Sequence, residues 1–483
     1  MTTAQEYLER RWTALILLCF AQFIVVLDGS IVNVALPSIG EALNFSESNL
    51  AWVVNAYVLA FGGFLLLGGR IADIAGRRAT FVGGLALFSV ASLAAGFAPS
   101  EGAMIAARAV QGLGAAVMSP AALSILVTLF ADGPERNKAL GVWGAASGAA
   151  GAVGVLLGGL FTDSIGWEWV FWVNVPVGIA AIVLAPRILP ESRREHGARH
   201  FDVAGAVTVT AALTLLVYAI VDAVDAGWGS TQTVSLLAVS AALMAAFVAI
   251  ELRSQAPMVP FRFFRSRSVR GGNLTSLLLG AGVFSMFFFV TLYMQQVLGY
   301  DAMETGVMWL AFAVPAMVSS GIASGLIEKV GARPLAVGGM ALVAAGLYLF
   351  SSVPVDGSYA AHLLVPMLVT AIGTGLAFVS VMAAATLGVR DDESGLASGL
   401  VNTGQQIGGA LGLGIMATIA TTRTEDLLGS GAQVPVGLTE GFQDAFMVGS
   451  GFALAGAVIA FVALRGPRRR VTVPREAAPQ PAA

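Results

Sequence analysis

Apolar stretches alternate with short polar segments along almost the whole chain. Each stretch has the roughly 20 residues that an α-helix needs to cross about 30 Å of hydrocarbon. Fourteen of them begin near Trp12, Leu50, Ala79, Gly102, Lys138, Trp169, Asp202, Thr233, Gly271, Glu304, Pro334, Ala360, Ala397 and Phe442. The pattern predicts an all-α membrane protein with fourteen transmembrane helices.

The basic residues test this count independently, because cytoplasmic loops of membrane proteins collect Lys and Arg. If both termini lie in the cytoplasm, the inner segments hold all of the 26 basic residues except Arg108, within a span, and Arg423, in an outer loop. Adding or removing one helix would put half of the basic loops on the wrong side. The charge pattern therefore favours fourteen spans with both termini cytoplasmic.

Composition agrees with a membrane protein and narrows its partners. The chain is 57% hydrophobic and only 11% charged, whereas soluble domains are about 25% charged. A net charge of -3 without a basic face excludes a nucleic-acid partner. Scarce lysine beside abundant alanine, glycine and arginine hints at a GC-rich bacterial genome, so we expect the bacterial cytoplasmic (inner) membrane.

Several chemistries are missing from the sequence. A G-x-x-x-x-G-K-[ST] nucleotide loop needs a lysine, and the only two, Lys138 and Lys329, stand in other contexts. His196 and His200 have helical spacing but lack the glutamate of the H-E-x-x-H zinc motif. We therefore expect no enzyme, no metal and no cofactor, with energy drawn from the proton gradient.

A loop repeat indicates the domain organisation. GGRIADIAGRR at residues 68–78 recurs as SGLIEKVGAR at residues 324–333, which pairs Gly76 with Gly331. The two loops lie eight predicted helices apart, as two six-helix bundles with two inserted helices would require, and parallel repeats are one known way to build a transporter. The predicted domains are a six-helix bundle (1–200), the inserted helices (201–255), a cytoplasmic amphipathic linker on the membrane lipids (256–270), a second six-helix bundle (271–466) and a disordered cytoplasmic tail (467–483).

Asp28 is the only charged residue in the apolar segment at residues 21–37. A carboxylate in the bilayer costs roughly 2.5–3.5 kcal/mol on insertion scales, so it is either paired or used through its protonation. At ~1.5 Å of rise per residue, Arg108 in the fourth span lies at a similar depth. We predict that Asp28 takes up a proton from outside while Arg108 and Gln111 adjust its proton affinity; the alternative is a permanently ionised structural pair.

The loop at residues 69–78 reads G-R-I-A-D-I-A-G-R-R and is similar to the inner-loop signature of the major facilitator superfamily. LDGSIVNVALP, RAVQGLGAA, WEWVFWVNVPVG and ASGLVNTGQQIGGALG resemble segments of its fourteen-helix drug:proton antiporter branch, which includes multidrug and quaternary-ammonium exporters. The resemblance implies a clamp that stabilises one access state, formed by Gly69, Asp73, Gly76, Arg77 and Arg78. Ile74 replaces a basic residue of the pattern, and a charged inner loop with turn glycines is the alternative.

Glycines three or four residues apart in the fifth span, including Gly154, Gly158 and Gly159, predict a groove for a close helix crossing. The antiporter motif of the resembled branch, G-x-x-x-G-P-x-x-G-G, falls on residues 150–159, where Ala150 and Val155 replace its first glycine and its proline. Without the proline we expect a straighter helix, and this weakens the argument for antiport. Simple small-residue packing is the alternative.

Two sets of side chains are candidates to line a substrate cavity. Uncharged polar residues in spans usually face the bundle interior, although helix-to-helix hydrogen bonding explains each of them equally well. Aromatic residues of the ninth span offer adaptable apolar surface. The candidates are Asn33, Asn55, Tyr57, Gln111, Phe284, Phe288 and Tyr293.

These observations together predict a proton-coupled exporter of small amphipathic organic compounds, such as drugs or antibiotics, that works as a monomer by alternating access. Gln405 stands where the resembled branch often has an arginine, and the later spans have no acid in mid-membrane, so permanently dicationic substrates are less expected. A lipid or glycolipid exporter on the same scaffold is the first alternative. A non-transporting sensor is the second, and the absence of any sizeable soluble segment argues against it.

Overall fold

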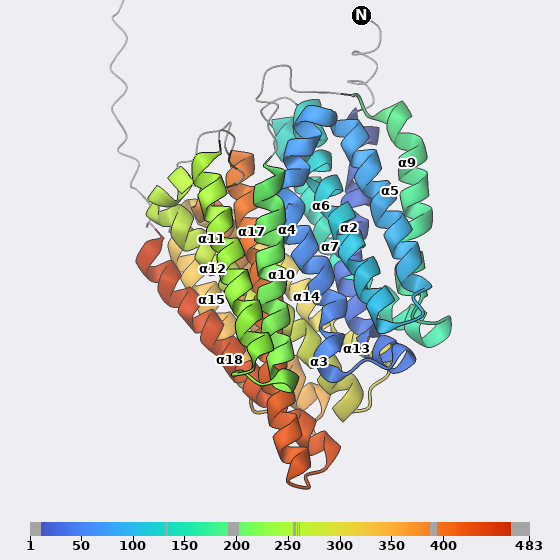
Figure 1. The fold of residues 1–483 in the computed structure, drawn as a ribbon. Helices are drawn as coiled ribbons and strands as arrows, with labels where there is room; N and C mark the ends of the chain where they lie inside the picture. The colour runs from blue at the N-terminus through green and yellow to red at the C-terminus, as the bar shows by residue number, and fades with distance from the viewer. Residues whose placement is uncertain are drawn as a thin grey trace, which may run out of the picture.

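The computed structural model describes residues 11–130, 134–191, 202–254, 257, 259, 261–386 and 394–464. Every regular element among them is helical (Figure 1). The first part of the chain forms α2 (Arg11–Leu43), α3 (Glu47–Leu50), α4 (Trp52–Ala75), α5 (Arg77–Gly96), α6 (Glu101–Leu129), α7 (Pro134–Ser164), α8 (Trp169–Trp172) and α9 (Asn174–Ile188). Two helices follow, α10 (Val203–Ala226) and α11 (Thr231–Arg253). The rest forms η1 (Phe261–Arg265), α12 (Arg267–Leu292), η2 (Tyr293–Val297), α13 (Ala302–Met308), α14 (Leu310–Val330), α15 (Ala332–Phe350), η3 (Tyr359–Leu363), α16 (Leu364–Thr386), α17 (Ser394–Gly429) and α18 (Val434–Ala463).

Ten helical segments in the described residues are long and apolar enough to cross a membrane. Shorter apolar helical stretches lie in α4, α7 and α10, at Trp52–Leu65, Ala149–Ser164 and Val207–Ile220. The all-α membrane fold predicted from the hydrophobic pattern is therefore confirmed. The count of fourteen spans and the side on which the termini lie stay predictions.

Each of the two loops of the sequence repeat turns at a glycine with positive φ. Gly76 joins α4 to α5 at φ 107°, and Gly331 joins α14 to α15 at φ 87°. A side chain at positive φ is strained, so a glycine suits a tight reversal between two long helices. The repeat thus marks equivalent turns in the two parts of the chain.

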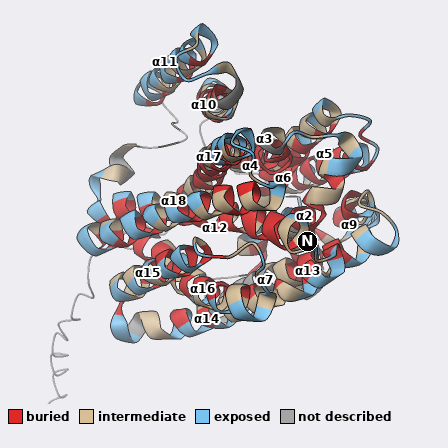
Figure 2. Cartoon of the chain, turned by 90° about the horizontal axis from the view of Figure 1, so that it is seen from below, coloured by how far each residue is buried: buried red, intermediate tan, exposed pale blue. Residues whose placement is uncertain are grey.

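The helices form two groups with α10 and α11 at the side (Figure 2). Helices α2 to α9 pack with one another, and so do α12 to α18. Helix α10 contacts both groups: Thr210 lies against Gly63 of α4, and Thr418 Oγ1 of α17 donates to Ile220 O at 3.0 Å. The predicted domain boundary at residue 200 and the predicted tail, 467–483, lie outside the described residues, as do parts of the predicted linker.

The two groups also meet at the end of the molecule that carries α3 and α13, below in Figure 1. There Asp163 Oδ2 at the end of α7 accepts from Met303 N of α13 at 2.6 Å, and Gln295 Nε2 donates to Val34 O of α2 at 2.9 Å. A cavity of about 620 Å³ opens at this end, between residues such as Glu41 and Tyr300. Asp163 and Gln295, which make these contacts between the two groups, also line the cavity.

Candidate functional site

Asp28 lies at the centre of a buried hydrogen-bond cluster inside the first helix group. Its Oδ2 accepts from Arg108 Nη1 at 2.6 Å, and its Oδ1 accepts from Gln111 Nε2 at 2.7 Å and from Asn174 Nδ2 at 3.0 Å. Asp28, Gln111 and Asn174 are fully buried, and Arg108 is 1% exposed. The sequence predicted the pairing of Asp28 with Arg108 and Gln111, and the structure brings all three together.

Bonds among its partners hold this cluster in place. Arg108 Nη1 also donates to Gln111 Oε1 at 2.7 Å, and Arg108 Nε donates to Val53 O of α4 at 2.9 Å. Asn174 Nδ2 donates to Ser92 Oγ of α5 at 3.1 Å, and Ser92 Oγ donates to Phe171 O at 2.8 Å. Five helices, α2, α4, α5, α6 and α9, and the short α8 therefore meet at one carboxyl group.

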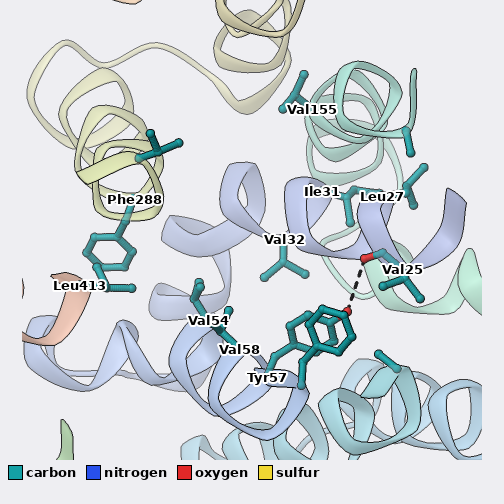
Figure 3. Packing of buried hydrophobic residues seen from close by; sticks show 14 of the residues in the cluster. Val25, Leu27, Ile31, Val32, Val54, Tyr57, Val58, Val155, Phe288 and Leu413 are labelled. Atoms are coloured by element: carbon teal, nitrogen blue, oxygen red, sulfur yellow. Dashed lines mark hydrogen bonds between the residues drawn. The ribbon is translucent and has the colours of Figure 1, made fainter. Parts of the chain in front are cut away.

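Aromatic rings and aliphatic side chains separate the cluster from the second helix group. The Arg108 guanidinium lies 4.3 Å from the Tyr57 ring centroid and 5.7 Å from that of Phe171, close enough for cation–π attraction. The Tyr57 hydroxyl donates to Val25 O at 3.4 Å. Figure 3 shows Val32, Val54 and Val58 between Tyr57 and the second-group pair Phe288 and Leu413. The charges thus lie in an apolar, low-dielectric surround.

This environment stabilises an ionised carboxylate in the conformation shown. The two oxygens accept three hydrogen bonds, one of them from the guanidinium that balances the negative charge. A buried charge is tolerated only when it is paired and hydrogen-bonded in this way. The arrangement is what the structural-pair alternative requires. A coupling role for Asp28 therefore needs a second conformation in which the carboxyl group meets water.

The predicted glycine groove packs against α2 next to Asp28. A β-carbon at Gly154 would stand 3.0 Å from Leu27 O, and one at Gly158 would stand 2.7 Å from Ile31 O, both on α2. Gly159 faces the other way, because its β-carbon would stand 2.4 Å from Ala302 O of α13. One short stretch of α7 therefore packs against the helix that carries Asp28 and also against the second helix group.

The described part of the predicted clamp loop bonds within the first group. Arg77 Nη1 donates to Thr128 Oγ1 of α6, and Arg78 Nη1 donates to Leu189 O after α9 at 3.1 Å. Glu191 accepts from Arg78 N and Ala79 N, each at 3.2 Å, at the start of α5. The side chain of Asp73 lies outside the described residues. Gly69 packs against α6, where a β-carbon added to it would lie 3.6 Å from Pro120 Cβ. A clamp against the other group stays a prediction.

The remaining cavity candidates fall in different places. Asn33, 7% exposed, donates to Gly29 O of its own helix at 2.6 Å. Asn55 is fully buried, and neither atom of its amide has a hydrogen-bond partner. Phe284 is half-buried against Gly409, whereas Phe288 and Tyr293 are buried within the second group. The structure does not gather these residues around one opening.

Sequence reasoning missed Asn174 and Ser92. Asn174 belongs to the WEWVFWVNVPVG stretch. It is the only uncharged side chain of that stretch that carries both a hydrogen-bond donor and an acceptor, since tryptophan has a single N–H donor. An amide within an apolar span was therefore the available signal. Ser92 carried none, because buried serines usually bond to their own helix.

A family model described as the Major Facilitator Superfamily matches residues 18–413. The chain belongs to the major facilitator superfamily. It is 40% identical over 463 residues to the "Puromycin resistance protein pur8" of Streptomyces alboniger, covering 94% of this chain and 91% of that protein. It is 43% identical over 450 residues to the "Cephamycin export protein CmcT" of Amycolatopsis lactamdurans, covering 92% and 91%. These relatives agree with the drug-exporting branch of the superfamily, whose members are transporters and not enzymes.

Solved structures show the same superfamily fold. A bacterial homologue of the human lysosomal transporter Spinster, in an inward-facing and unoccupied conformation, has a TM-score of 0.67 at 15% identity and covers 94% of this chain and 97% of that one. The peptide transporter PepTSo also has a TM-score of 0.67 at 15% identity. At this identity the likeness concerns the fold alone.

Proposed function

We propose that this protein exports amphipathic, antibiotic-like organic compounds from a bacterium in exchange for protons. The observation that carries the proposal is the likeness to two relatives whose names concern puromycin resistance and cephamycin export, each over more than nine tenths of both chains. The lipid alternative has no comparable support.

Alternating access of the two helix groups is the proposed mechanism. The superfamily fold has two bundles, and here they are joined at the α3 and α13 end by the α7–α13 contact and the Gln295–Val34 bond. We assign that end to the outside, with fourteen spans and cytoplasmic termini, because the basic residues gather at the other end. The conformation described is then closed to the outside.

Asp28 is the proposed proton carrier. When α7 separates from α13, the outer half of α2 loses the Gln295 bond and water can approach the carboxyl group from outside. Protonation removes the negative charge that holds Arg108, so the two protonation states favour different arrangements of α2 and α6. One proton that crosses 100 mV is worth about 2.3 kcal/mol, which the exporter can use to move its substrate uphill.

The second group supplies apolar surface to the substrate. Among its described residues in α12 to α18, the buried polar side chains are uncharged, so an amphipathic molecule meets little desolvation cost there. Phe284 of α12, half-buried, is the aromatic candidate best placed to touch it. The clamp loop at residues 69–78 is proposed to stabilise the other access state, in which the protein is closed at the inner end.

A susceptibility panel in an efflux-deficient bacterium tests the function. We expect the wild-type protein to raise the inhibitory concentration of one or more amphipathic antibiotics, and a protonophore to remove the increase. Asp28→Asn should give no protection at equal membrane abundance, whereas Arg423→Gln, on the exposed α17–α18 hairpin, should protect like wild type. No protection from the wild-type protein together with altered envelope lipids would instead favour lipid export.

A further inference from the structure

Asn174 differs from the other partners of Asp28 in what it can offer a protonated carboxyl group. Arg108 carries donors only, so it can bind the carboxylate but not a carboxylic-acid hydrogen. The acceptor of Gln111, Oε1, is already bonded by Arg108 Nη1 at 2.7 Å. Asn174 Oδ1 is buried and has no hydrogen-bond partner. It is the one free acceptor on the three side chains that bond to Asp28.

From this geometry we propose that Asn174 is the positioning residue that allows Asp28 to hold a proton: a half-turn of its amide replaces the Nδ2 donor with the Oδ1 acceptor. The inference rests on the proposed coupling role of Asp28. In the conformation shown, Nδ2 donates to Asp28 Oδ1 at 3.0 Å. After the turn, the new O–H of Asp28 donates to Asn174 Oδ1 over the same gap.

Ser92 makes the turn possible. A hydroxyl both donates and accepts, and Ser92 Oγ now accepts from Asn174 Nδ2 at 3.1 Å while it donates to Phe171 O at 2.8 Å. When the amide turns, the hydroxyl hydrogen rotates from Phe171 O to Asn174 Oδ1. Phe171 O keeps the bond from the Val173 N–H. Ser92 and Asp28 therefore find a hydrogen-bond partner on Asn174 in both protonation states, while Nδ2 turns to the side on which Oδ1 now has no partner.

The proton comes from water on the outer side, binds to the Asp28 carboxylate and returns to water on the inner side. No other reactant is consumed. The charged or titratable side chains that face the cluster among the described residues are Arg108 from α6 and Tyr57 from α4. Helix α5 presents Ser92, α9 presents Asn174, and α7 presents glycines. The proposed response to pH therefore involves Asp28 and these partners.

Two substitutions at Asn174 should move the pH dependence of transport in opposite directions. Asn174→Leu removes the one acceptor that has no other hydrogen-bond partner, while the carboxylate keeps Arg108 and Gln111. In this variant the buried O–H of protonated Asp28 has no acceptor, which costs more free energy than the loss of one of the three bonds to the carboxylate. Half-maximal exchange should therefore need about a tenfold higher proton concentration, which places the midpoint about one pH unit lower. Asn174→Asp places a second carboxyl beside the first, and because two carboxylates share a proton, the midpoint should move to higher pH.

The measurement is the initial rate of substrate–proton exchange in proteoliposomes against pH. Ser92→Ala should shift the midpoint like Asn174→Leu but less, and Ser89→Ala should leave it unchanged. Ser89 is the matched control, because it is a buried serine one turn away on α5 that packs against α9 at Gly178, and its hydroxyl has no hydrogen bond to Asn174. A merely structural role would lower the rate equally at every pH.

The outcomes separate this inference from the function on which it rests. If Asp28→Asn abolishes proton-driven exchange while both Asn174 variants keep the wild-type midpoint, the role of Asn174 is wrong and the coupling role stands. If Asp28→Asn still drives uphill export, the coupling role itself is wrong. If either variant folds poorly, Asn174→Ser replaces it, since serine both donates and accepts and should stay nearer the wild-type midpoint than leucine.

Discussion

Two ion pairs in this protein have the same length and opposite surroundings. Arg108 and Asp28 are 2.6 Å apart with side chains 1% and 0% exposed, and Arg423 and Glu440 are also 2.6 Å apart with side chains 44% and 37% exposed. The first pair joins α6 to α2 inside the helix group. The second joins α17 to α18 in the hairpin that projects below the bundle in Figure 1. Distance alone would rank them equal.

Burial makes the two pairs differ in kind. Water solvates both members of the hairpin pair whether or not they touch, so such a pair is worth about 0–1 kcal/mol. Water does not solvate the charges of the buried pair. Loss of one member therefore leaves the other charged and unpaired, at a cost of about 3–5 kcal/mol. Because each charge of the buried pair depends on the other, protonation of Asp28 strongly changes the energy of Arg108. This sensitivity is what an exporter driven by protons requires.

The largest expected effect comes from breaking the buried pair. Arg108→Leu should destabilise the protein by about 3–5 kcal/mol, because Asp28 is left buried without its counter-ion. The double variant Asp28→Leu/Arg108→Leu should recover most of that loss, since neither charge remains. Thermal unfolding in detergent at fixed pH measures both. A loss below about 1 kcal/mol for the single variant would place the buried pair in the same class as the exposed one.

The smallest expected effect comes from the hairpin. Arg423→Gln should change stability by no more than about 1 kcal/mol, and the change should shrink further at high salt because exposed charges are screened. The same unfolding assay at low and high ionic strength measures it. A salt-independent loss of several kcal/mol would mean that exposure does not separate the two pairs.

The sequence predicted most of the fold because hydropathy and charge carry that information directly. Predicted starts near Trp12, Trp169 and Thr233 lie within two residues of the observed starts of α2, α8 and α11. The last helix was predicted to begin near Phe442, but α18 begins at Val434. Hydropathy marks where a helix meets lipid, whereas α17 and α18 continue as helices beyond that point, with Arg423 on their exposed surface.

The site was predicted in part, and the missing part has a physical reason. Asp28 and Arg108 are visible because a charge in an apolar span is costly and needs an explanation. Asn174 and Ser92 cost little in a span and pair with many groups, so one sequence does not show which partner each one has. Their contact with Asp28 depends on how α5 and α9 pack against α2. Only the structure shows that packing.

Uphill transport by reconstituted protein tests the central claim, that the buried carboxyl group of Asp28 carries the coupled proton. Wild-type and Asp28→Asn protein are placed in proteoliposomes at matched amounts, and accumulation of a fluorescent amphipathic substrate is followed with and without an imposed pH gradient. Wild type should accumulate substrate only with the gradient, while Asp28→Asn should merely let the substrate equilibrate down its own gradient. Accumulation by Asp28→Asn equal to that of wild type would contradict a proton-carrying role for Asp28.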